Sequence, residues 1–251
     1  MRVVAGALLV SFACASVAPA GPADQCAVAA HLVHADAGMP NSVKAIDKTK
    51  TLKVVVVGSA SSTLPGPAGI AIAYPSKFEM TLQKRLPGVN VQVVSVAKPR
   101  QTAQDMADGM LQILKEQNPA LVVWQTGTVD AMRGVGAEAF QATLDTTVEK
   151  IQASGADVIL MNMQFSPRTE AVIASTAYAE AIRYVALQRS VNLFDRQSIM
   201  RQWNELGTFD FLTPTKSLDT AALVHSCIGS MLADLVLEAV KSPDNKDSPK
   251  Q

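Results

Sequence analysis

The sequence has few of the features that mark several large classes of binding protein. Aromatic residues make up only 5% of its 251 residues, which argues against a stacking platform for bases or sugars. Basic and acidic residues number 22 each, so there is no basic excess for binding nucleic acid. The phosphate-cradling patterns GxGxxG and GxxxxGKS/T are absent. We therefore expect no nucleic-acid partner and no cofactor.

Cysteine and histidine are also scarce, with three of each. His31 and His34 lie three residues apart, but no third ligand lies near them in the sequence. Cys26 and Cys227 are far apart in the chain, unlike the closely spaced ligands of a zinc site. We therefore expect no metal site.

The N-terminus has the pattern of a secretory signal peptide. Met1-Arg2 is a short positive start, residues 3–17 form an apolar run, and Ala18-Pro19-Ala20 has the small-x-small form of a cleavage site. An uncleaved membrane anchor and a lipoprotein acylated at Cys14 are the alternatives. We predict a signal peptide at residues 1–20, a periplasmic or secreted protein, and no transmembrane segment after its removal.

Export would leave Cys26 and Cys227 as the cysteines of the mature chain. An even pair in an oxidising compartment predicts one disulfide, which would tie the mature N-terminus to the last helix. Two separate buried thiols are the alternative.

Buried strands and amphipathic helices alternate along the rest of the chain. Leu52–Thr63 (LKVVVVGSASST) opens with four valines and no alternation, as expected of a strand buried on both faces. Further strands are expected at Asn90–Val96, Ala120–Gln125, Asp157–Asn162 and Val191–Asp195. Helices are expected at Ser76–Leu86, Thr102–Gln117, Ala137–Ser154, Thr169–Gln188, Gln197–Leu206 and Thr220–Lys241, with loops at Gly127–Gly136 and Gln164–Arg168. The alternation predicts a parallel sheet with helices on both faces, in one α/β domain at residues 51–241.

A leader with little secondary structure at 21–50 precedes it, and a disordered tail at 242–251 follows.

Small and polar residues follow several of the expected strands. Open α/β sheets bind ligands at the carboxyl edge of their strands, so residues at these positions are candidate ligand contacts. They are Gly58, Ser59 and Ser62 after the first strand, Gln125 and Gly127 after the third, and Gln164 after the fourth. Loop capping is the alternative role for the glutamines.

The order of segments resembles the SGNH/GDSL hydrolases, a family of esterases, over most of residues 52–240. The resemblance depends on VVGSASST, on SVAKPRQT and on LVVWQTGTVDA, which stand in the places of the family's first three blocks. It implies a three-layer α/β/α sandwich with a five-stranded, parallel, flavodoxin-like sheet. It also implies a serine ester hydrolase.

The residues at the family's catalytic positions differ from those that the resemblance implies. Ala60 stands where the nucleophilic serine is expected, with Ser59 and Ser61 on either side. Arg100 lies near the position of the second block's glycine, and Val129 replaces the asparagine of the oxyanion hole. Counted from Cys227, the family's aspartate and histidine fall on Lys216 and Asp219.

Two functions of different classes follow. One is an active esterase with Ser61 as nucleophile, His225 as base, Asp130 as orienting carboxylate and amides near Gly58–Ser62 as oxyanion donors. The other is a catalytically degenerate relative that binds a small-molecule ester, an acylated glycan or an unknown protein partner. Losing one oxyanion donor costs a hundred- to a thousandfold in rate, roughly, and a serine without an adjacent imidazole is a poor nucleophile. We therefore favour the second function. Asp130 is also expected to pair with Arg133 in a structural ion pair.

Overall fold

A computed structural model of the chain describes residues 24–213 and 217–242. The predicted signal peptide at 1–20, position Lys216 and all but the first residue of the predicted tail at 242–251 lie outside these ranges.

A five-stranded parallel sheet forms the middle layer of the domain. Its strands are β1 (Thr51–Gly58), β2 (Asn90–Ala97), β3 (Leu121–Gln125), β4 (Asp157–Met161) and β5 (Asn192–Phe194). They lie in the order β2-β1-β3-β4-β5, and every pair is parallel. This order is that of a flavodoxin-like sheet, which confirms the predicted fold class.

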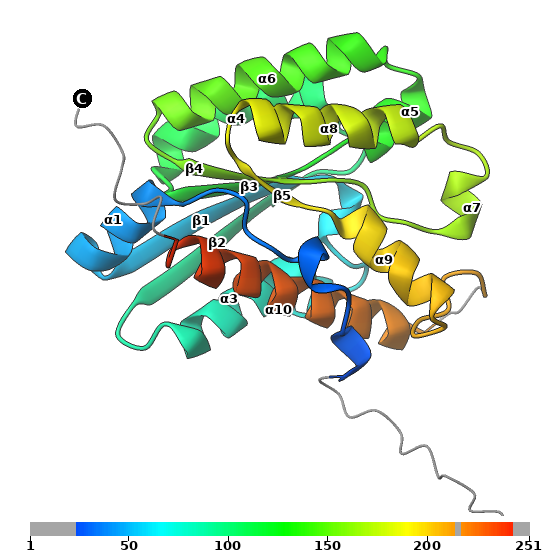
Figure 1. Cartoon of the computed structure of the whole chain (residues 1–251), viewed down its shortest axis with the longest axis horizontal. Coiled ribbons are helices and arrows are strands. Elements are labelled where there is room, and N and C mark those ends of the chain that lie inside the picture. Colours follow the sequence, from blue (N-terminus) through cyan, green and yellow to red (C-terminus); the bar gives the residue numbers. More distant parts are fainter. Residues whose placement is uncertain (1–23, 214–216, 243–251) are drawn as a thin grey trace, which may run out of the picture.

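Helices cover both faces of the sheet (Figure 1). One side carries α1 (Pro40–Thr49), α3 (Tyr74–Arg85), α9 (Arg196–Glu205) and α10 (Asp219–Ala239). The other side carries α4 (Ala103–Gln117), α6 (Ala137–Ala153) and α8 (Thr176–Gln188). The short helices are α2 (Gly69–Ile72), α5 (Thr128–Arg133) and α7 (Pro167–Glu170), together with single turns at Asp24–Cys26, Ala30–Leu32 and Ala60–Ser62.

The valines of β1 explain why its sequence does not alternate. Val54 and Val56 pack in the apolar cluster under α3 and α10, whereas Val55 and Val57 pack in the cluster under α4 and α6. Successive side chains of a strand point to opposite faces, and here both faces are covered by helices.

The described residues of the expected leader, 24–50, are part of the domain rather than a segment with little secondary structure. Asn41 and Ser42 lie in the first turn of α1, and their backbone amides donate to the Asp157 carboxylate at 3.2 and 2.7 Å. The carboxylate satisfies amides that a helix N-terminus leaves unpaired. Met39, just before α1, is fully buried in the core.

Two connections differ from the sequence prediction. Gly127–Gly136 contains the short helix α5 instead of a simple loop, and the helix expected at Thr169–Gln188 begins only at Thr176. Val172, which lies inside the predicted helix, is 81% exposed. The connection before α8 is instead fixed by polar contacts, such as the Ser175 hydroxyl donating to Glu170 at 2.7 Å.

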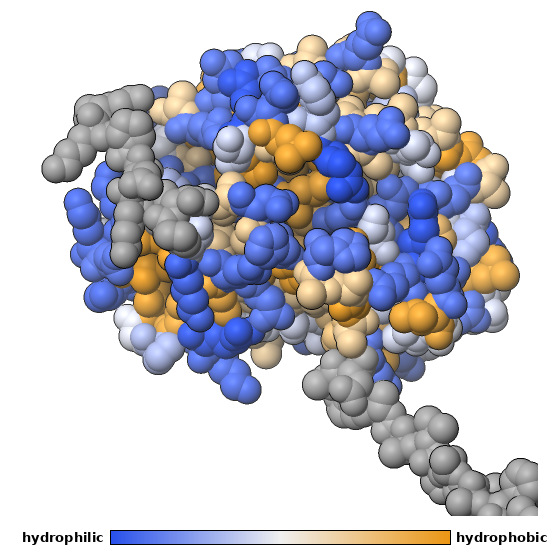
Figure 2. Space-filling view, viewed as in Figure 1, coloured by the Kyte–Doolittle hydropathy of each residue, from blue (hydrophilic) through white to orange (hydrophobic). Residues whose placement is uncertain are grey.

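Helix α10 is long and apolar enough to span a membrane by length and composition alone. In the folded domain it is a core helix, with Leu232, Leu235 and Val236 fully buried. Figure 2 shows mainly hydrophilic side chains, with scattered apolar patches, over the face that carries α9 and α10.

The predicted disulfide between Cys26 and Cys227 is present, with Cα atoms 5.2 Å apart. It ties the N-terminal segment to α10, as expected. The same segment is held by the Ala29 amide, which donates to the Gln202 side chain at 3.1 Å, and by the Ala37 amide, which donates to Asn192 at 3.0 Å.

Replacing Cys26 with serine should lower the free energy of unfolding by about 2–4 kcal/mol, because the crosslink restricts the unfolded chain. Denaturant unfolding of the wild type and the variant measures this change. The reduced wild-type protein is the matched control and should lose the same amount. Equal stability of the oxidised and reduced wild type would contradict the prediction.

Candidate functional site

The candidate site lies at the carboxyl edge of the sheet, where β1 and β3 are neighbours. The chain runs from β1 outward to β2, then returns across β1 to β3 on its other side. The connections after β1 and β3 therefore leave on opposite faces of the sheet and open a crevice between them.

A tight turn of serines follows β1. Residues Ala60–Ser62 form a single helical turn, in which the Ser62 amide donates to the Ser59 carbonyl at 2.9 Å. Gly58 is required before this turn, because a Cβ atom there would lie 2.2 Å from Ser62 Oγ. The turn thus folds back onto the strand end.

Gln125, the last residue of β3, is the acceptor around which the serine turn is arranged. Its Oε1 accepts from the Ser59 amide at 3.1 Å and from the hydroxyls of Ser61 and Ser62 at 3.0 Å each. The Ser59 hydroxyl also lies 3.2 Å from this oxygen, and Gln125 is 0% exposed. Its Nε2 is buried and has no hydrogen-bond partner among the described residues.

Arg196, the first residue of α9, contacts Ser61 from the other side. Its Nη2 donates to Ser61 Oγ at 3.2 Å and its Nη1 to the Ser61 carbonyl at 3.3 Å. The side chain is buried, with the residue only 3% exposed. Burial lowers the pKa of Arg196 to about 10, which leaves the guanidinium charged at neutral pH. Within residues 24–213 and 217–242 no carboxylate forms an ion pair with it, and its Nε has no partner.

His225 lies on α10, within the helix as expected, and is held by the start of α3. The Tyr74 backbone amide donates to His225 Nδ1 at 2.9 Å. Burial, together with the positive charge of Arg196, lowers the pKa of His225 to about 4. The ring is therefore neutral at pH 7, and because Nδ1 accepts, its proton is on Nε2. A histidine that acts as a base towards serine needs the opposite arrangement, with Nδ1 protonated and Nε2 free.

Asp130 lies in α5, and its carboxylate accepts from the Ala103 amide at the start of α4, at 2.9 and 3.1 Å. Burial raises the pKa of Asp130. The expected ion pair with Arg133 is not formed. Arg133 instead donates to the Arg100 carbonyl at 2.9 Å and lies 3.7 Å from the Asp105 carboxylate. The Asp130 carboxylate points at the N-terminus of α4, because the Ala103 amide there has no acceptor within the helix.

The three residues proposed for catalysis therefore have separate partners. In the part of the chain that the structure describes, no hydrogen bond joins Ser61, His225 and Asp130 to one another. Two of the proposed oxyanion donors are also occupied, because the amides of Ser59 and Ser62 donate within the turn and to Gln125. Asp219, which matches the family's histidine position, is the first residue of α10.

A cleft of about 480 Å³ opens beside the turn. Of the predicted ligand contacts, Ser59 and Gln164 line this cleft, as does Ser61. Its lining comprises Ser59, Ala60, Ser61, Pro99, Arg100, Thr128, Val129, Met132, Arg133 and Gln164. Gln125 and Gly127 are buried behind it instead, and Gly127 at φ +101° leaves room for Met163, whose Sδ would lie 2.6 Å from an added Cβ.

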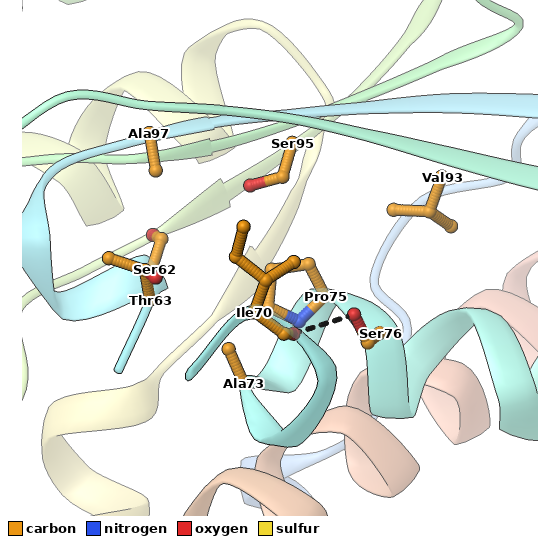
Figure 3. A pocket seen from close by; sticks show the side chains of 9 residues that line it. All are labelled: Ser62, Thr63, Ile70, Ala73, Pro75, Ser76, Val93, Ser95 and Ala97. Atoms are coloured by element: carbon orange, nitrogen blue, oxygen red, sulfur yellow. Dashed lines mark hydrogen bonds between the residues drawn. The ribbon is translucent and has the colours of Figure 1, made fainter. Parts of the chain in front are cut away.

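Ser62 faces a second cavity, of about 260 Å³, on the other side of the turn. Figure 3 shows Val93, Ser95 and Ala97 of β2 along one side and Ile70, Ala73, Pro75 and Ser76 on the other. Ser62 Oγ is also 2.9 Å from the Tyr74 hydroxyl. The serines of the turn are thus divided between two cavities.

Arg100 has a left-handed backbone, with φ +64°. This region is strained for residues with a side chain and favours glycine. The resemblance implied a glycine near this position, so the glycine-type backbone is present although the residue is arginine. Its side chain is exposed and lines the cleft.

Arg196 and Tyr74 are site residues that the sequence prediction missed. Arg196 lies two residues after the end of β5, so the rule that selected Gln125 and Gln164 would also have selected it. Tyr74 follows no strand, and only the fold brings it to Ser62. No group of three or more histidine, cysteine or acidic side chains in the described residues is placed to hold a metal ion.

Comparison with known proteins adds to this geometry. A model of the Non-GDSL lipase-like family matches residues 25–242. The chain is 30% identical to esterase TesA of Pseudomonas aeruginosa over 116 residues, which are 45% of this chain and 55% of that esterase. The match thus spans about half the length of the curated relative.

Solved structures share the fold. The crystal structure of TesA has a TM-score of 0.55 at 22% identity and covers 73% of this chain and 99% of that one. An α/β hydrolase from the metagenome of Lake Arreo has a TM-score of 0.60 at 18% identity, covering 76% and 97%. A catalytic mutant of Axe2, an acetylxylan esterase from Geobacillus stearothermophilus, has a TM-score of 0.57 at 17% identity, covering 76% and 94%. At these identities the likeness shows the fold alone.

The lowered pKa of His225 predicts a pH dependence of stability. The ring takes up a proton near pH 6.5 when unfolded but only near pH 4 when folded, so acidification through this window favours the unfolded state. The contribution is present above pH 6.5, and up to about 3 kcal/mol is lost as the pH falls to 4.

Denaturant unfolding at pH 7 and pH 4.5 measures this loss. The His225→Asn variant, whose side-chain oxygen can take the place of Nδ1 as acceptor from the Tyr74 amide, should lose less stability over the same interval. The buried carboxyl groups of Asp130 and Asp157 titrate in both proteins and cancel in the comparison. An equal loss in both proteins would refute the assignment to His225.

Proposed function

Because this chain belongs to the Non-GDSL lipase-like family, we propose that it is an exported, hydrolase-derived binding protein whose cleft holds an ester or an acylated molecule without efficient turnover. The alternative is a serine esterase that uses Ser61 and His225. The two functions differ in whether the serine hydroxyl can lose its proton to a base.

The surroundings of Ser61 Oγ are the observation that carries the proposal. Its hydrogen is directed to Gln125 Oε1 at 3.0 Å, and a lone pair accepts from Arg196 at 3.2 Å. Neither partner can act as a base, because a carboxamide oxygen is weakly basic and a guanidinium is a cation. The serine is held by structural hydrogen bonds rather than activated, and an unactivated hydroxyl is a poor nucleophile at neutral pH.

The neutral His225 does not compensate for the missing base. Its Nδ1 lone pair is occupied by the Tyr74 amide at 2.9 Å, which leaves Nε2 as a donor. In a catalytic triad, removal of one member already costs most of the activity. With Ala60 and Val129 also at catalytic positions, several contributions are missing together.

The cleft and the relatives support an acylated ligand. Ala60, Pro99, Val129 and Met132 give the cleft an apolar wall that fits a short acyl chain. The relatives include an esterase and an acetylxylan esterase, so both an acyl ester and an acetylated glycan are candidate ligands. Export is supported by the apolar N-terminus and by the disulfide between Cys26 and Cys227.

The proposal is tested by hydrolysis of p-nitrophenyl acetate and p-nitrophenyl butyrate by the purified mature protein. We expect any release of p-nitrophenol to stay at the level of the Ser61→Ala variant, because the hydroxyl has no base. His225→Gln should likewise leave the rate unchanged.

The Ser198→Ala variant is a matched control for nonspecific effects of removing a serine near the sheet edge. Rapid turnover by the wild type that either Ser61→Ala or His225→Gln abolishes, while Ser198→Ala retains it, would overturn the binding function and establish the esterase.

A further inference from the structure

Strand β2 is an edge strand of the sheet, with β1 as its only neighbour among the described strands. The Asn90 amide donates to the carbonyl of Lys50 at 2.8 Å. The Lys98 amide donates to the carbonyl of Gly58 at 3.1 Å, and the register between these two bonds is unbroken. The even-numbered residues of β2 therefore bond to β1, and the backbone groups of the odd-numbered residues face outward.

Side chains of α3 cap one half of this outer edge. The Val91 amide donates to Gln83 Oε1 at 3.0 Å. The Val93 amide donates to Glu79 Oε1 at 2.9 Å. Proteins cover their edge strands because unpaired amides and carbonyls are a template for pairing with another chain. Here the cover extends only as far as the Val93 amide.

The other half of the edge is open. The outward amides of Ser95 and Ala97 have no hydrogen-bond partner in the ranges that the structure describes, and Ser95 is exposed. An extended peptide presents amides and carbonyls at the same spacing as these groups, so it can pair with them as an additional strand.

A cavity of about 260 Å³ lies against the open half of the edge. Val93, Ser95 and Ala97 direct their side chains into it, opposite Ile70 and Pro75 (Figure 3). No charged side chain is among the described residues that line it. In peptides that add to a sheet edge, such cavities receive alternate side chains and give specificity. This cavity therefore favours a small, uncharged side chain.

Two cations follow the open half of the strand. Lys98 and Arg100 are exposed, and neither side chain has a hydrogen bond or ion pair within the described part of the chain. An acidic residue at this end of a bound peptide would be attracted to them. The gain in affinity is small, because these charges are solvated.

We propose that the open half of β2 binds an extended peptide segment of a partner protein, which joins the sheet as an additional strand. The peptide backbone pairs with Ser95 and Ala97, a small uncharged side chain occupies the cavity, and an acidic residue lies at the Lys98 end. This surface is separate from the cleft beside Ser61, so the inference does not depend on the proposed function.

Hydrogen exchange followed by NMR tests the pairing directly, with the peptide acetyl-Glu-Thr-Val-Thr-Val-Thr-Glu-amide as the probe. Its valines suit the cavity, and a glutamate at each end allows either strand direction. The probe should slow exchange of the Ser95 and Ala97 amides about tenfold or more. The amides of Val94 and Val96 already bond to β1, so they are an internal control and should change little.

Two methylated analogues of the probe test whether its backbone makes the contact. One carries N-methyl groups on both valines, and the other carries them on the first two threonines. In an added strand, alternate amides face β2 and solvent. One analogue should therefore lose about tenfold or more in affinity, whereas the other should bind like the probe. Isothermal titration calorimetry measures both.

Variants of the protein test the same contact from the other side. Ser95→Pro removes one outward amide and leaves the bonds to β1 in place, because proline is tolerated on an edge strand where its nitrogen faces outward. It should weaken probe binding about tenfold. Ser95→Ala keeps the amide and is the matched control, which should bind like the wild type.

Charge is tested with Lys98→Glu, which should weaken probe binding about two- to threefold. Lys150→Glu makes the same change at an exposed position of α6, on the opposite face of the sheet, and should leave the affinity unchanged.

Several results would overturn the inference. The first is exchange of the Ser95 and Ala97 amides that about 1 mM probe does not slow. The second is probe binding that both methylated analogues keep, or that both lose. The third is protection of these amides without the probe that disappears on dilution, which would assign the edge to a second copy of the chain. If Ser95→Pro does not fold, the methylated analogues decide. Ester turnover bears on the cleft alone.

Discussion

One buried carboxamide oxygen holds the candidate site together. Gln125 Oε1 is the common acceptor for the turn after β1, and it receives an amide hydrogen from Ser59 and hydroxyl hydrogens from Ser61 and Ser62. Because Gln125 is enclosed by the protein, no water can replace it, and a buried hydroxyl without an acceptor is unfavourable. The place of every serine in the turn therefore depends on the last residue of the neighbouring strand.

This arrangement underlies our proposal that the site retains a hydrolase scaffold without its chemistry. A nucleophilic serine needs a base that withdraws its hydrogen, and here that hydrogen is directed to a neutral acceptor. The positive charge that contacts Ser61 comes from Arg196, and it also opposes protonation of His225. The same buried cation thus contacts the serine and adds to the effect of burial that keeps the histidine neutral.

The fold was predictable from the sequence because its evidence is local. The four valines of β1 and the regular alternation of apolar strands with helices are read within short windows.

The site was predictable only in part. Ser59 and Gln164, two of the predicted ligand contacts, line the cleft, but the contact between Arg196 and Ser61 joins residues 135 positions apart. The same limit explains the missed helix α1, whose first turn is stabilised by Asp157, more than a hundred residues away.

The disulfide gives the covalent chain a closed topology. Cys26 and Cys227 are separated by 201 positions, and all five strands lie between them. The sheet is therefore contained in one covalent ring. A protease that cuts a single loop within the ring leaves one connected molecule, whose fragments stay side by side and can hold the sheet together. For the exported protein proposed above, such tolerance of nicking is an advantage that packing alone does not provide.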